Sequence, residues 1–103
     1  MDHSTLFKLL KKLNLPVAYD HFEENDNLVP PFCVYREIEP DTFKADNKVY
    51  AEFNNFEIEL VTKKKDVALE KKITDLLSNN NNPYDKSNSW DKDEKIYHIF
   101  YEI

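Results

Sequence analysis

The stretch KVYAEFNNFEIELVTKKKD, residues 48–66, alternates apolar and polar side chains on both sides of Asn54-Asn55. Such alternation is typical of a β-strand with one face in a core. Two alternating runs joined by a short Asn-rich turn predict a β-hairpin between residues 49–53 and residues 56–60. The predicted buried face of the second strand consists of Phe56, Ile58 and Leu60.

Two helices are predicted, one on each side of this stretch. The first begins near Ser4, a favoured N-cap, and leucines three or four residues apart give it one apolar face as far as Leu13. The second covers residues 67–78 after Asp66, another favoured N-cap. Its apolar stripe consists of Leu69, Ile73, Leu76 and Leu77. Because the second helix joins two groups of strands, we expect it to pack across the sheet, with the first helix on the same face or at an edge.

Three further strands are predicted outside the hairpin. Residues 32–40 form an apolar run that ends at Pro40, and residues 84–90 give a weaker signal. The strongest signal is EKIYHIFYEI, residues 94–103, in which both alternating sets are largely apolar. Such a strand is either central in a sheet or covered on one face by a neighbouring subunit. Residues 15–22 would add a short extended segment.

The predicted order of elements is α-β-β-β-α-β-β, in a chain with the length of one domain. We therefore expect residues 1–103 to form a single α+β domain. Its mixed or antiparallel sheet would have about four to five strands, with the two helices packed on it.

The composition excludes several classes of function. The chain has no glycine, which rules out the Gly-rich loops that bind nucleotide phosphates and leaves turns to Asn, Asp and Pro. Its net charge of −6 argues against generic nucleic-acid binding. No apolar run approaches the ~20 residues of a membrane span, and the N-terminus lacks the layout of a signal peptide. We expect a soluble protein of a reducing compartment.

The sequence predicts no catalytic, cofactor or metal site. None of its three histidines has another ligand at a recognised metal spacing, and His98 is expected to be a packed or hydrogen-bonded side chain. Residues 91–102 imitate a calcium loop, but Lys95 and Ile96 stand where a ligand and a glycine are needed. Cys33 lies in an apolar run, which indicates a buried structural thiol.

Charged and aromatic side chains offer candidates for contacts with other proteins. Lys63, Lys64 and Lys65, continued by Lys71-Lys72, form either a solvated turn and helix face or a patch for an acidic partner or nucleic acid. The acidity of the whole chain favours the solvated face. The residues expected at a subunit or partner interface are Glu57, Glu59, Lys63, Lys64, Lys65, Tyr97 and Tyr101.

Several segments together resemble a known family. These are ADNKVY at 45–50, FEIELVTKKKD at 56–66 leading into the pattern DxxLExxI, and the closing KIYHIFYEI at 95–103. With LPVAYDHF and the PPF-V-Y segment that follows it, they resemble the small head–tail joining proteins of siphophages. This is the tail-terminator or tail-completion family, found in phages and prophages of Gram-positive hosts. The resemblance extends from about Leu15 to Ile103, and Val61 departs from it where an aromatic residue is expected.

The resemblance implies a structural virion protein, with residues 1–103 as one tail-terminator-like domain. Such proteins commonly form a hexameric ring that ends polymerisation of the tail tube and joins the tail to the head. The implied partners are further copies of the chain, the major tail protein and a head connector protein, with no membrane and no sequence-specific nucleic acid. The implied location is the tail–head junction of the virion, reached from the host cytoplasm during assembly. The family carries no catalytic residues, so an enzyme is not expected.

Two other functions remain open at the level of sequence. One is a head-side connector, or head-completion protein, at the same junction. The other is a small acidic regulator that binds a host protein.

Overall fold

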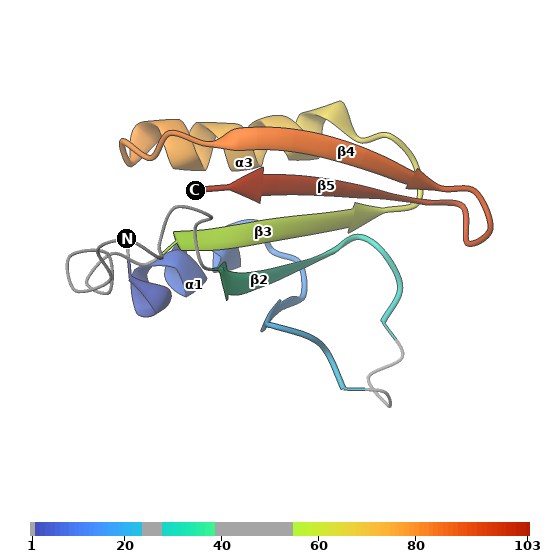
Figure 1. Ribbon diagram of the computed structural model, residues 1–103, viewed down its shortest axis with the longest axis horizontal. Helices are drawn as coiled ribbons and strands as arrows, with labels where there is room; N and C mark the ends of the chain where they lie inside the picture. The colour runs from blue at the N-terminus through green and yellow to red at the C-terminus, as the bar shows by residue number, and fades with distance from the viewer. Residues whose placement is uncertain (1, 24–27, 39–54) are drawn as a thin grey trace, which may run out of the picture.

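The centre of the structure is a five-stranded sheet with the strand order β1-β2-β3-β5-β4 (Figure 1). The computed structural model describes residues 2–23, 28–38 and 55–103. Its elements are α1 (His3–Lys11), β1 (Val17–Tyr19), β2 (Phe32–Ile38), β3 (Asn55–Thr62), α3 (Val67–Asn79), β4 (Asp85–Asp91) and β5 (Ile96–Glu102). The α+β class and the order α-β-β-β-α-β-β are confirmed.

The sheet is mixed because one edge strand runs parallel to its neighbour. β1 pairs with β2 in parallel, whereas β2 with β3, β3 with β5 and β5 with β4 are all antiparallel. The short β1 and the longer β4 are therefore the two edges. The last strand of the chain, β5, lies inside the sheet, which its apolar character on both faces had indicated.

The two described helices, α1 and α3, pack on the same face of the sheet, which we call the covered face. In Figure 1, α3 lies behind β4, and the leucines of α1 belong to the same hydrophobic core as those of α3. The predicted buried side chains Phe56, Ile58 and Leu60 are at most 1% exposed. In the predicted stripe of α3, Leu69, Ile73 and Leu77 are buried and Leu76 is partly buried. The alternating apolar side chains of β3 and the apolar stripe of α3 therefore face each other across one core.

Capping follows the sequence at one helix and differs at the other. Asp66 caps α3 as predicted, since its carboxylate accepts a hydrogen bond from the Leu69 N–H at 3.0 Å. The first helix begins before Ser4, because the Asp2 carboxylate accepts the Thr5 N–H at 2.8 Å and caps the helix from there. A carboxylate also suits the positive end of the helix dipole.

Turns without glycine use Asn and Asp, as the composition predicts. Four described residues have positive φ, namely Asn14, Asp20, Asn81 and Lys95. Asn81 follows α3, where Asn82 N–H reaches back to the Leu77 carbonyl at 2.9 Å. In the β4–β5 turn, the Asp91 carboxylate accepts the N–H groups of Asp93 and Glu94.

The predicted pairing of residues 56–60 with residues 49–53 in a hairpin was wrong. Both edges of β3 are occupied by other strands, β2 and β5, and Asn55 is the first paired residue of β3, opposite Ile38, where we expected a turn. Residues 49–53, the other strand of the expected hairpin, and Asn54 of its turn lie outside the described residues. Residues 39 and 40, at the end of the strand predicted at 32–40, also lie outside them. The extended segment at 15–22 contains β1 and supplies the first strand of the observed order.

Candidate functional site

The face of the sheet opposite the two helices, here the open face, is the main candidate for function. Strand register places on it alternate residues of β2, β3, β5 and β4. They are Phe32, Val34, Arg36, Ile38, Asn55, Glu57, Glu59, Val61, Ile96, His98, Phe100, Glu102, Asp85, Ser87, Ser89 and Asp91. This face combines charged side chains with apolar ones, unlike the apolar covered face. Of its apolar side chains, Val34 and Val61 are buried and the others are half-buried.

A network of charged side chains crosses the middle of the open face. Arg36 on β2 donates through Nη1 to Glu57 Oε1 at 2.6 Å and through Nη2 to Glu59 Oε1 at 3.0 Å. The other oxygen of Glu59 lies 2.6 Å from His98 Nδ1 on β5. The four side chains join three strands, and each keeps between 16% and 28% of its surface exposed.

The network holds the guanidinium firmly in its charged form. Partial burial alone would lower the pKa of Arg36, but the hydrogen bonds to Glu59 and Glu57 outweigh it and raise that pKa above its ordinary value. Removing Arg36 would leave two half-buried carboxylates, 28% and 16% exposed, without their cation. The network therefore holds these four side chains of the open face in place.

Apolar side chains flank this network. Phe32 lies opposite Val61, and its ring contacts that of Phe22, with centroids 5.4 Å apart. On β5, the rings of Phe100 and His98 stack with centroids 6.2 Å apart. Ile38, Ile96 and Phe100 are all half-buried, so each keeps apolar surface in water on a face that neither described helix covers.

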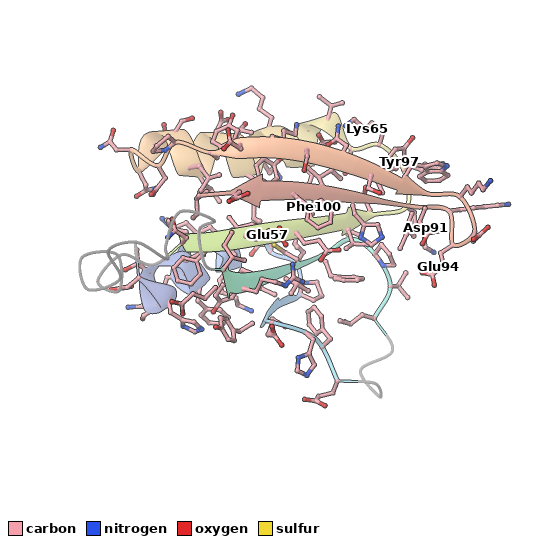
Figure 2. All side chains as sticks on the ribbon, viewed as in Figure 1. Glu57, Lys65, Asp91, Glu94, Tyr97 and Phe100 are labelled. Atoms are coloured by element: carbon pink, nitrogen blue, oxygen red, sulfur yellow. The ribbon has the colours of Figure 1, made fainter. Side chains whose placement is uncertain are left out.

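A hollow of about 390 Å³ opens in the β4 half of the open face. It is lined by Glu57, Asp85, Lys86, Ser87, Phe100 and Glu102. Figure 2 shows Glu57 and Phe100 on the neighbouring strands β3 and β5 at this place. The hollow gives an otherwise flat sheet a recess that can receive a side chain.

The carboxylate–imidazole pair resembles part of a hydrolytic triad, in which an acid orients a histidine toward a nucleophile. Ser89 lies directly opposite His98 in the strand register. Among the hydrogen bonds of the described residues, none joins Ser89 to His98. Within residues 2–23, 28–38 and 55–103 there is also no group of three side chains that could hold a metal ion.

The predicted interface residues are divided between different parts of the molecule. Glu57 and Glu59 lie on the open face, where Arg36 holds both. Lys63 and Lys64 are exposed on the turn before α3, and Lys65 on the same turn binds Glu70 at 3.0 Å. The glutamates and lysines of the predicted interface therefore lie on different surfaces of the chain.

The two predicted aromatic contacts differ in accessibility. Tyr97 is half-buried on the covered face, where its ring centroid lies 4.5 Å from that of the exposed Trp90. Tyr101 was wrongly expected at the surface: it is fully buried, and its hydroxyl donates to the Glu70 carbonyl at 3.2 Å. Burial is also the largest cause of the raised pKa of Tyr101.

A buried carboxylate that sequence reasoning missed lies beneath β4. Glu70 of α3 is only 3% exposed, and its carboxylate binds Lys86 at 2.7 Å and Lys65 at 3.0 Å. Burial acts to raise the pKa of Glu70, but the hydrogen bonds and charges of the two lysines outweigh it and lower that pKa. The signal was present, since Glu70 stands one turn before Ile73 on the apolar stripe. Its role is to join α3 to the edge strand.

The remaining predicted features have structural positions. Cys33 is fully buried, as expected, and burial raises the pKa of its thiol to about 12. His98 is hydrogen-bonded, also as expected. In the segment that imitates a calcium loop, Glu102 pairs in register with Asp85, at the end of β5 away from Asp91.

Comparison of the chain with protein-family models, curated proteins and solved structures finds no match in any of the three. Neither helix in the part of the chain that the structure describes is long and apolar enough to cross a membrane. The candidate site therefore rests on the geometry of the open face and its charges.

Proposed function

We propose that this chain is a structural virion protein that caps the phage tail tube and joins it to the head. It would act by ring assembly, as a hexamer of identical chains, and by contacts with the major tail protein and a head connector protein. This function needs no catalytic group and no cofactor. Its place would be the tail–head junction, reached from the host cytoplasm during assembly.

The observation that carries the proposal is the open face. One side of a small sheet keeps half-buried apolar side chains beside a pre-arranged charge network, with no helix of the described chain over it. Exposed apolar surface rimmed by polar groups is typical of protein contact surfaces. A subunit whose function is assembly requires such surfaces.

The segments that carry the resemblance support the same function. LPVAYDHF contains β1, FEIELVTKKKD spans most of β3 and the turn into α3, and KIYHIFYEI contains β5. These are the inner strands, one edge and the helix connection of the sheet. The resemblance therefore concerns the strands and the connection that form the framework of the domain. We expect an assembly protein to keep its sequence pattern in this framework.

The test is the length and completion of tails in the phage that encodes this chain. Deleting its gene is expected to leave heads and tails unjoined, with tails of irregular length because nothing ends tube polymerisation. Immunogold labelling of the tagged chain is expected at one end of isolated tails. Label on isolated heads alone would indicate the head-side connector, and intact virions after deletion would contradict both assignments.

A further inference from the structure

Charges of opposite sign are separated between the two sides of the domain. Among the described residues, the open face carries five carboxylates, those of Glu57, Glu59, Asp85, Asp91 and Glu102, and one guanidinium, that of Arg36. Arg36 is shared by the two glutamates of β3, so Asp85 and Glu102 keep their charge for a partner. The open face is thus strongly acidic.

The opposite side is basic. We define the helical layer as α1 with Lys12, the turn at residues 63–65, and α3. Its lysines are Lys8, Lys11, Lys12, Lys63, Lys64, Lys65, Lys71 and Lys72.

The carboxylates of the helical layer are occupied within the chain. Asp2 and Asp66 cap the helices, Asp75 binds Lys71 at 2.8 Å, and Glu70 is buried against two lysines. Six lysines of the layer are exposed and form no ion pair with a carboxylate of the described residues: Lys8, Lys11, Lys12, Lys63, Lys64 and Lys72.

We propose that the open face of one copy docks onto the helical layer of a second copy. Acidic and basic surfaces on opposite sides of one chain are complementary between successive copies, so every copy both offers and accepts the contact. The half-buried Ile38, Ile96 and Phe100 would lose their remaining contact with water in the interface. The hollow beside Phe100 gives the contact a recess for a side chain of the docked copy.

This contact is heterologous, since different surfaces of the two copies meet. Heterologous contacts build a ring when the rotation between copies closes and an open filament when it does not. The inference therefore rests on the proposed function in one respect: it names the subunit interface of the proposed ring. The contact itself is a property of the isolated chain and can be tested without phage tails.

Charge reversal on each surface tests the contact. The open-face variant is Asp85→Lys with Glu102→Lys; these two residues are exposed, face each other in register, and lie outside the Arg36 network. The helical-layer variant is Lys64→Glu with Lys72→Glu. The matched control is Asp93→Lys with Glu94→Lys on the β4–β5 turn, which changes the net charge as much as the open-face variant but alters neither surface.

Sedimentation velocity at low salt is the readout, because salt screens exposed charges. The unaltered chain and the turn control are expected to associate alike. Each surface variant should associate at least about tenfold more weakly. A chain carrying both reversals should regain association, because the exchanged residues on its two surfaces again carry opposite charges. Urea unfolding of every variant confirms that it folds; if the combined chain does not fold, mixing the two surface variants tests the same complementarity.

Three results would overturn the contact. One is an unaltered chain that stays monomeric up to about 1 mM at low salt. Another is association that neither surface variant weakens, and the third is a folded combined variant, or a mixture, that does not regain association. Failure of the proposed function would look different: charge-dependent association would persist, but the tagged chain would not label tails. Labelled tails without charge rescue would leave the function standing and remove this interface.

Discussion

Ile99 and Ile96 are both isoleucines of β5, but the side chain of Ile99 lies on the covered face and that of Ile96 on the open face. Ile99 is fully buried against the helices, whereas Ile96 keeps part of its surface in water. The covered face is closed by this chain itself. On the open face, the charges of the Arg36 network are paired, whereas Asp85 and Glu102 form no ion pair with the described residues. Ile38, Ile96 and Phe100 are only half-buried, so part of this face stays in contact with water.

The largest difference between the faces should appear when these two isoleucines are truncated. Ile99→Ala is expected to lower the free energy of unfolding by about 2–5 kcal/mol, because it removes core packing and leaves a cavity. Ile96→Ala, the matched control, should cost less than about 1.5 kcal/mol in the monomer, since its site is already partly hydrated. Urea unfolding of both variants measures the difference, provided that the free energy of unfolding depends on urea concentration with the same slope in both. Equal losses would contradict the distinction between the two faces.

The next largest effect concerns the buried charge beneath β4. Glu70→Gln is expected to cost about 1–3 kcal/mol at neutral pH, because Lys65 and Lys86 lose a buried ionic partner. Asp75→Asn, which removes the exposed ion pair with Lys71 on the same helix, should cost at most about 0.5 kcal/mol. Chemical denaturation at neutral pH compares the two, and a larger loss for Asp75→Asn would contradict the role given to Glu70.

The pH dependence of the same variants sharpens this prediction. The folded state lowers the pKa of Glu70 below its ordinary value of 4.5. Its contribution to stability is therefore complete above that value and is lost as the pH falls through the lowered pKa. Denaturation curves should show the unaltered chain losing more stability than Glu70→Gln as the pH falls below 4.5. Parallel loss in both chains would show that Glu70 is not the titrating group.

A smaller effect is expected from the network on the open face. Arg36→Gln should destabilise the monomer by about 1–2 kcal/mol, since its carboxylate partners stay partly hydrated. A double-mutant cycle with Glu57→Gln isolates the pair and should give a coupling of at least about 0.5 kcal/mol. A coupling near zero would mean that Arg36 does not organise this face in solution.

The covered face could be predicted from sequence because its signals are local. Alternation marked Phe56 and Ile58, and helical spacing marked Ile73, each within a few residues of chain. Asp66 was recognisable as a cap for the same reason, since it binds an N–H only three residues away. Such features do not depend on which strands become neighbours.

The open face could not be predicted because it depends on strand order. Glu59 finds Arg36 and His98 only when β2 and β5 take the two sides of β3, and these partners lie 23 and 39 residues away along the chain. The two sides of β5 are both largely apolar, so periodicity alone could not tell that Tyr101 is buried and Phe100 is half-exposed. Glu70 needed Lys86 from a later strand to make its burial favourable.

Mixing the two surface variants tests most directly whether the open face binds the helical layer of another copy. Alone, Asp85→Lys with Glu102→Lys should remain monomeric at concentrations where the unaltered chain associates, and so should Lys64→Glu with Lys72→Glu. An equimolar mixture should associate, because the second variant keeps its acidic open face and the first variant keeps its basic helical layer. Sedimentation velocity should then show faster-sedimenting species in the mixture but in neither variant alone. A mixture that sediments as monomers, while the unaltered chain associates, would contradict this contact.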